Sequence, residues 1–142
     1  MRNAKHPGKL RVVLDTNVIV SSLQFPNGTL GGLWQPFHEG KYGIILSKFI
    51  VSETARKLRD KFRWEEAELQ HALRTIVRKA EIVEPKAVPR VVPDDSDDDH
   101  IAACALEGQA DLIVSGDRHL SKLGSYAGIP IVRPVDFLRT IG

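Results

Sequence analysis

Short apolar runs alternate along the chain with longer segments in which apolar residues recur at helical spacing. The short runs predict five buried strands, at residues 10–14, 42–46, 80–83, 111–114 and 129–132. The amphipathic segments predict helices at residues 18–23, 29–39, 48–61, 64–79, 97–108 and 134–140. Strands that alternate with helices are typical of a mostly parallel sheet, here of about five strands, packed between helices in a three-layer α/β/α sandwich.

The length of 142 residues fits a single domain spanning residues 1–142, in which residues 1–9 form a loose N-terminal arm. No apolar run is long enough to span a bilayer, and the basic N-terminus has no apolar signal core, so we expect a cytoplasmic protein. The single cysteine, Cys104, excludes an internal disulfide. Its position among apolar helix residues predicts a buried, unreactive thiol.

Polar residues directly follow two of the predicted strands. Asp15, Thr16 and Asn17 come after the strand at 10–14, and Ser115-Gly116-Asp117 comes after the strand at 111–114. Connections between parallel strands are right-handed, so equivalent strand ends fall on one edge of the sheet, where open α/β sheets bind ligands. The alternative is that Asp15 or Thr16 only caps the next helix.

A dense acidic cluster precedes the helix predicted at 97–108. Five of the six residues from 94 to 99 are aspartates, and such a cluster is costly unless a cation neutralises it. The apolar face of the helix, extended backward, reaches Asp97 and Asp98, whereas Asp99 is rotated away. We therefore expect Asp97 or Asp98 above the buried side at the helix start; a helix cap in a solvated acidic loop is the alternative.

Glu53 lies on the apolar stripe of the helix predicted at 48–61, three residues after Ile50. An unpaired buried charge is expensive, so this carboxylate should have a partner. The sequence offers two kinds of partner: a nearby cation, Arg56 or Lys57, or a metal ion.

The net charge of +2 hides an asymmetry between the acidic cluster and the rest of the chain. Outside the cluster, the 20 lysines and arginines outnumber the 13 remaining acidic residues by seven. The basic residues of the predicted helical hairpin are Arg59, Lys61, Arg63, Arg74, Arg78 and Lys79. A basic body around one acidic spot suits a polyanionic substrate and a bound cation, although a dispersed solvated surface has the same count.

Four segments together resemble the PIN-domain ribonucleases, most closely the VapC-like toxins of bacterial toxin–antitoxin pairs. They are DTNVIVSSL at 15–23, SKFIVSE at 47–53, DDDHIAACA at 97–105 and IVSGDRHL at 113–120. The likeness spans Val12 to about Leu138 and implies a PIN-like sandwich. It implies a catalytic, metal-binding set made of Asp15, Glu53, Asp98 and Asp117.

The resemblance also implies supporting polar residues around these acids: Thr16, Asn17, Ser115 and Asp97. The family often has Thr-x-Asp where this chain has Ser115-Gly116-Asp117, and a serine hydroxyl can make the same contact. Alignment of the apolar helix selects Asp98 as the third acid, with Asp97 as its rival. His100 and His119 are near the acids in sequence, and we expect them to be surface or supporting residues, with contact to the substrate as the alternative.

The activity implied is that of an endoribonuclease dependent on Mg²⁺ or Mn²⁺. Hydrolysis of a phosphodiester needs a nucleophilic hydroxide and charge neutralisation, and a hard cation held by carboxylates provides both. The implied partners are an RNA substrate and a cognate antitoxin; a homodimer is compatible with them, and no membrane is involved.

Two alternatives to a nuclease stay open on the sequence. One is a non-cleaving, metal-dependent module that binds nucleic acid or docks an antitoxin. The other is a phosphatase or phosphotransfer receiver, which also gathers acids at parallel strand ends. A receiver should carry a lysine after a later strand, and the later strand ends offer none, since Lys122 falls within a further helix expected after Asp117.

Overall fold

The computed structural model describes residues 8–90 and 96–141. Its six strands form one sheet and are β1 (Leu10–Leu14), β2 (Tyr42–Ser47), β3 (Glu81–Val83), β4 (Leu112–Val114), β5 (Ser125–Tyr126) and β6 (Ile129–Val132). The order across the sheet is β3-β2-β1-β4-β6-β5. All neighbours are parallel except β5 and β6, which are antiparallel.

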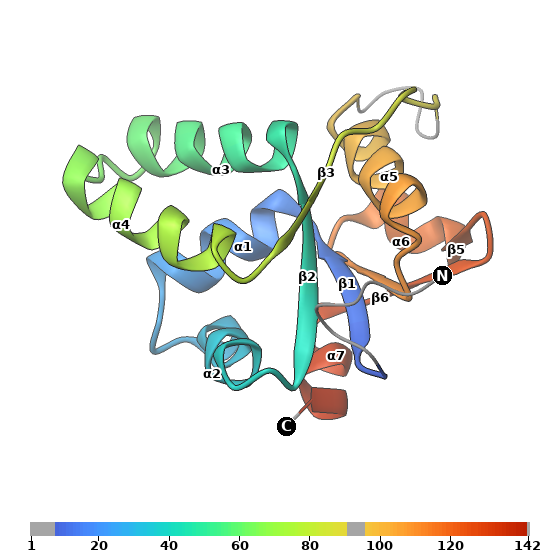
Figure 1. The fold of residues 1–142 in the computed structure, drawn as a ribbon, viewed down its shortest axis with the longest axis horizontal. Coiled ribbons are helices and arrows are strands. Elements are labelled where there is room, and N and C mark those ends of the chain that lie inside the picture. Colours follow the sequence, from blue (N-terminus) through green and yellow to red (C-terminus); the bar gives the residue numbers. More distant parts are fainter. Residues whose placement is uncertain (1–7, 91–95, 142) are drawn as a thin grey trace.

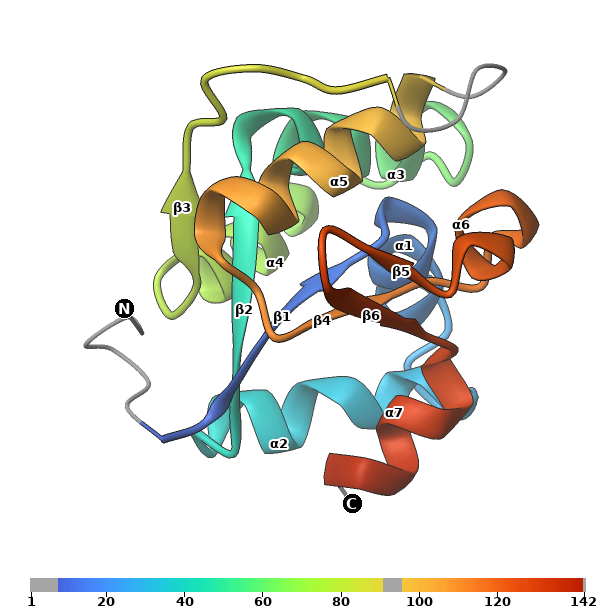
Figure 2. The ribbon, with the colours of Figure 1, turned by 90° about the vertical axis from the view of Figure 1, so that its right-hand side faces the viewer.

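The helices flank this sheet on two sides, which confirms the α/β sandwich. They are α1 (Thr16–Gln24), the 3₁₀ helix η1 (Thr29–Leu33), α2 (Trp34–His38), α3 (Lys48–Asp60), α4 (Glu66–Val77), α5 (Ser96–Gly108), α6 (Arg118–Leu123) and α7 (Pro134–Ile141). Helices α1 to α4 lie on one side of the central strands, and α5 and α6 lie on the other (Figure 1). Figure 2 looks onto the side of α5 and α6. Within residues 8–90 and 96–141, no helix is long and apolar enough to cross a membrane.

Two local features differ from the prediction. The segment predicted as one helix at 29–39 consists of the 3₁₀ helix η1 followed directly by α2, and within η1 the chain passes very close to itself: a Cβ on Gly31 would lie 1.9 Å from the carbonyl oxygen of Pro26. The sheet has a sixth strand, β5, which is too short to show a period. Its hairpin turns at Ala127 and Gly128, both with positive φ, as in a type I′ turn.

One end of α5 is tied to the sheet by a buried arginine. Arg11 of β1 is 2% exposed, and its guanidinium donates to the carbonyl oxygens of Gly108 (2.7 Å) and Gln109 (3.1 Å) at the end of α5. The same guanidinium pairs with Glu81 of β3. This network at the amino ends of the strands fixes α5, whose opposite end carries the aspartates.

Helix α5 is buried on several sides, which changes which aspartates are buried. The five residues from Ile101 to Ala105 are each at most 2% exposed, so Cys104 is a core residue as predicted, and burial raises the pKa of its thiol to about 12. Asp98 and Asp99, at the start of the same helix, are also buried, whereas Asp97 is exposed. The expectation that Asp99 is rotated away is therefore wrong, because it assumed a single apolar face.

Candidate metal centre

The two central strands end at the point where the strand order reverses. From β1 the chain passes through α1 to β2 on one side, and from β4 it passes through α6 to β6 on the other. Such a reversal leaves a crevice at the carboxyl ends of the strands. A cavity of about 480 Å³ opens there, and its lining includes Asp15, Asn17, Asp117 and His119.

Asp15 is held at this crevice by hydrogen bonds from both neighbouring segments. It is the N-cap of α1, where its Oδ1 accepts from the backbone N–H of Asn17 at 3.3 Å. Its Oδ2 accepts from the hydroxyl of Ser115 at 2.7 Å. Burial raises the pKa of Asp15 above its ordinary value, and the charge of Asp117 acts in the same direction, against the two hydrogen bonds. A cation nearby would favour the ionised form.

Ser115 connects this carboxylate to the next one. Its hydroxyl oxygen accepts a 3.0 Å hydrogen bond from the backbone N–H of Asp117 while its proton is donated to Asp15. Asp117 in turn caps α6, because its Oδ1 accepts from the backbone N–H groups of His119 (2.8 Å) and Leu120 (3.1 Å). Both capping hydrogen bonds go to Oδ1, so capping does not involve Oδ2 of Asp117.

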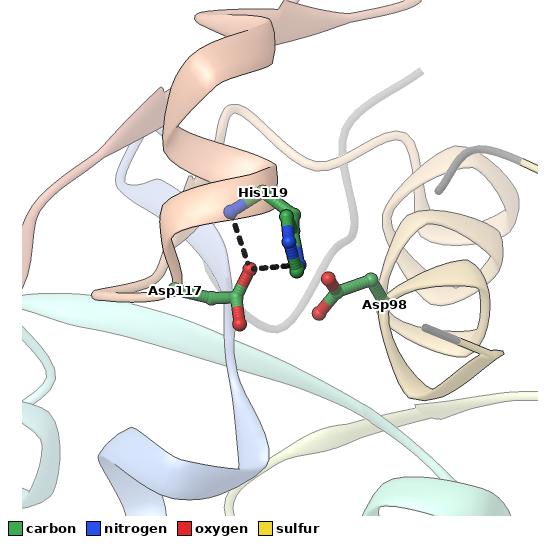
Figure 3. A group of neighbouring side chains, drawn as sticks. All are labelled: Asp98, Asp117 and His119. Carbon is green, nitrogen blue, oxygen red and sulfur yellow. Dashed lines mark hydrogen bonds and ion pairs between the residues drawn. The ribbon is translucent and has the colours of Figure 1, made fainter. Parts of the chain in front are cut away.

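Three side chains from two helices form the group that could hold a metal ion. Asp98, Asp117 and His119 each offer one ligand atom, and these atoms lie within 4.8 Å of one another. Figure 3 shows Asp98 projecting from its helix toward Asp117 and His119. The Oδ2 atom of Asp98 is buried without a hydrogen bond from the described residues, although the side chain has other interactions.

The donor set fits a divalent cation. Carboxylate oxygens suit Mg²⁺ and Mn²⁺, and an imidazole nitrogen is acceptable to Mn²⁺ and to later transition metals. Two ligands of one such ion are at most about 4.2 Å apart, which is twice a bond length of about 2.1 Å. Ligand atoms within 4.8 Å of one another therefore need only a small closure. Asp98 and Asp117 carry like charges in a partly buried place, and a cation removes that repulsion.

The family is decided by the sequence comparison. A family model described as PIN domain matches residues 11–119, which is most of the chain. This chain belongs to the PIN-domain family. PIN domains are generally nucleases and typically use divalent metal ions. Family membership therefore indicates a nuclease centre that binds such an ion.

One solved structure shares the overall fold of this chain. The crystal structure of PAE2754 from Pyrobaculum aerophilum is similar over 98% of this chain and 95% of that chain, with a TM-score of 0.59. The sequence identity is 16%, so this likeness shows the fold alone. The comparison with curated proteins gave no significant match.

Glu53 is half-buried on α3 and forms an ion pair with the side chain of Arg56 on the same helix. Arg56 donates to it twice, at 3.0 Å from Nε to Oε2 and at 2.7 Å from Nη2 to Oε1. These hydrogen bonds lower the pKa of Glu53. Among the described residues, the group that could hold a metal does not include Glu53. Of the two kinds of partner considered from the sequence, the structure shows the nearby cation, Arg56. The role of Glu53 as a metal ligand stays a prediction.

Three of the four supporting polar residues, Thr16, Asn17 and Ser115, lie next to Asp15, and the fourth, Asp97, is exposed in the first turn of α5. Thr16 is buried as the first residue of α1, and the side-chain oxygen of Asn17 accepts a 2.8 Å hydrogen bond from Lys57 of α3. The charge of Lys57 also acts to lower the pKa of Asp15. A positive side chain therefore reaches the edge of the candidate centre. Of the acidic cluster, residues 94 and 95 lie outside the described part of the chain.

The two histidines near the acids have different surroundings. The ring of His100 stacks on Phe49 of α3, with 3.7 Å between the centroids and 8° between the planes. His119 instead joins the group with Asp98 and Asp117. Its side chain is 48% exposed, in keeping with the expected surface residue, and its place in this group adds a histidine to the acids expected from the sequence. The available signal was that it lies in the first turn of a helix capped by one of the candidate acids.

Proposed function

We propose that this PIN domain is an endoribonuclease dependent on Mg²⁺ or Mn²⁺, and that it is the toxin of a toxin–antitoxin pair acting in the cytoplasm. The observation that carries the nuclease proposal is the approach of Asp98, Asp117 and His119 to within 4.8 Å, next to the buried Asp15. Membership of the PIN-domain family supports the same chemistry.

In this proposal the ion is held by Asp98 and Asp117, with Asp15 and Glu53 completing the acidic set. A divalent cation supplies charge neutralisation and a nucleophile at neutral pH. Ser115 orients the carboxylate of Asp15 and the backbone of Asp117 together, since its hydroxyl bonds both. The carboxylates that do not coordinate the ion are available to orient the attacking water.

The choice of RNA rests on charge and on the resemblance to VapC-like ribonucleases. Lys57 lies beside Asn17 at the edge of the crevice. Further from it, α4 and its two flanking segments carry exposed cations: Lys61, Arg63, Arg74, Arg78 and Lys79. A phosphate backbone would be attracted to this side of the molecule by sequence-independent electrostatics. Such attraction positions the RNA backbone but does not select a base sequence. The sequence at which the RNA is cleaved would be determined by other contacts.

The toxin proposal predicts an effect on cells that the nuclease proposal alone does not. Expression of the wild-type chain in a bacterial host should arrest growth, and expression of Asp117→Asn should not. Growth arrest by both variants, or by neither, would speak against a toxin that acts through this centre. The antitoxin is then the protein whose co-expression restores growth and which copurifies with this chain.

A cleavage assay tests the nuclease proposal directly. Labelled single-stranded RNA and DNA of the same sequence are incubated with the purified chain in Mg²⁺, in Mn²⁺ and in EDTA. We expect cleavage of RNA in either metal and none in EDTA. Asp136→Asn is the matched control, because it removes an exposed carboxylate on α7 that pairs only loosely with Arg133 and Arg139. It should cleave like the wild type.

The main competing function is a PIN domain that binds nucleic acid without cutting it. Metal-dependent retention of RNA in a gel shift, together with intact RNA in every metal, would favour that function. The receiver alternative loses its basis, because the chain belongs to a different family.

A further inference from the structure

We propose that His119 supplies a nitrogen ligand to the divalent ion of this centre, and that it biases the centre toward Mn²⁺ over Mg²⁺. The proposal rests on the metal centre of the proposed function and specifies its donor set. The acids alone would make a site of oxygen donors, which hold either cation. One imidazole in the set changes the preference, since nitrogen donors suit the transition metal better.

The backbone of α6 holds His119 at the acids. Its own N–H donates to Oδ1 of Asp117 at 2.8 Å, so the residue follows the carboxylate that caps the helix. Its ring nitrogen Nδ1 lies 3.8 Å from the same oxygen. Figure 3 shows the ring on one side of the Asp117 carboxylate, with the Asp98 side chain nearby. Asp98 therefore comes from the first turn of α5, and Asp117 and His119 come from the N-cap and the first turn of α6.

The distance between His119 and Asp117 is compatible with a shared ion. At 3.8 Å, the nitrogen and oxygen are beyond the range of a hydrogen bond, which is about 2.7 to 3.2 Å. The same separation is compatible with two ligands of one ion, which are about 3 to 4.2 Å apart at bond lengths of about 2.1 Å. The separation therefore fits two ligands of one ion, and it equally fits an ion pair between Asp117 and a protonated His119.

The ring also has room to adjust. The side chain of His119 is 48% exposed, so it can rotate toward an ion without disturbing the core. It lines the same cavity as Asp15 and Asp117, into which a phosphate group of a substrate can enter. A nitrogen ligand on the open side of the centre therefore leaves the buried side to Asp98 and Asp15.

Two measurements on metal-loaded protein test the assignment without using activity. Electron spin-echo spectroscopy of bound Mn²⁺ should show coupling to ¹⁴N in the wild type and none in His119→Gln. In calorimetric titrations, His119→Gln should weaken Mn²⁺ binding by at least about tenfold and weaken Mg²⁺ binding less. His71→Gln, which alters an exposed histidine on α4, is the matched control and should bind both ions like the wild type.

The outcomes separate this inference from the proposed function. Mn²⁺ binding that is lost in Asp117→Asn, but that shows no ¹⁴N coupling in the wild type, overturns the histidine ligand alone. An unchanged ratio of Mn²⁺ to Mg²⁺ affinity in His119→Gln does the same. If the wild type binds neither ion, or binds them as well after Asp117→Asn, the metal centre itself is refuted and the histidine ligand with it.

Discussion

Ser115 donates a 2.7 Å hydrogen bond to Oδ2 of Asp15, although the two residues are 100 positions apart in the sequence. Each directly follows one of two neighbouring parallel strands, β1 and β4, which brings them together. The same hydroxyl accepts from the backbone of Asp117. One buried side chain therefore sets the relative position of two candidate catalytic acids.

Ser115→Ala should damage both stability and activity. The substitution leaves Asp15 and the N–H of Asp117 without this partner, and an unsatisfied buried group costs about 1–3 kcal/mol of unfolding free energy. Metal affinity should fall by about 10- to 100-fold, as when groups that orient metal ligands are removed. Urea unfolding and calorimetry measure the two effects. Ser121→Ala, exposed on α6, is the control, and equal behaviour of the two variants would contradict the proposed role.

Asp15→Asn should change how the stability of the metal-free protein depends on pH. Burial raises the pKa of Asp15 above its ordinary value of 3.8, so the native state binds the proton more tightly than the unfolded state. The stability contributed by this group is then greatest at low pH and falls as the pH rises from about 3.8 through the raised native pKa.

The variant lacks this group, so its stability relative to the wild type should increase with pH over that range. Urea unfolding of both proteins in EDTA, from about pH 4 to about pH 7, measures the difference. If the difference in unfolding free energy between the two proteins stays constant with pH, the pKa of Asp15 is not raised in the native state.

The acids at the strand ends could be predicted because their positions follow from local pattern and topology. An apolar strand followed at once by Asp15, or by Ser115 and Asp117, fixes a carboxylate at one edge of a parallel sheet. The strands β1, β2 and β6 were predicted within one residue for the same reason: each is a short, strongly apolar run.

The remaining features depend on contacts between distant segments. Burial of Asp99 results from the packing of α5 on several sides, and Gly31 in η1 lies very close to the backbone of Pro26. The group with His119 requires α5 and α6 to converge, which no local period encodes. These are tertiary effects, so the sequence pattern left Asp97 and Asp98 as alternatives, and it placed His119 near Asp117 without showing that Asp98 lies beside both.

Among the three aspartates at the start of α5, Asp98 should carry the activity. Asp98→Asn should abolish RNA cleavage, because Asp98 is the one of the three that joins Asp117 and His119. Asp97→Asn should be mild, since Asp97 is exposed, and Asp99→Asn should cost stability more than activity, since Asp99 is buried. Cleavage rates are compared at equal folded concentration, as determined by urea unfolding. An inactive Asp97→Asn beside an active Asp98→Asn would shift the assignment by one residue.

Glu53→Gln distinguishes a fourth metal-binding acid from a structural ion pair. We predict that cleavage falls by orders of magnitude while the melting temperature in EDTA is unchanged or raised, because one negative charge leaves the acidic set. The pair with Arg56 should contribute little, about 1 kcal/mol or less, because Arg56 is 53% exposed.

Arg56→Gln is the matched control for Glu53→Gln, since it breaks the same pair and keeps the acid. It should remain active. If both variants cleave like the wild type and lose stability equally, Glu53 belongs to the ion pair and not to the centre.

The most direct test of the metal-dependent nuclease is the rate of RNA cleavage as a function of Mn²⁺ concentration in wild type and Asp117→Asn. Asparagine is as good a helix N-cap as aspartate, so α6 should keep its start while the charge is lost. The account predicts a wild-type rate that rises to saturation with Mn²⁺ and vanishes in EDTA, and no such rise in Asp117→Asn. Superimposable curves for the two proteins, or wild-type cleavage that persists in EDTA, would contradict it.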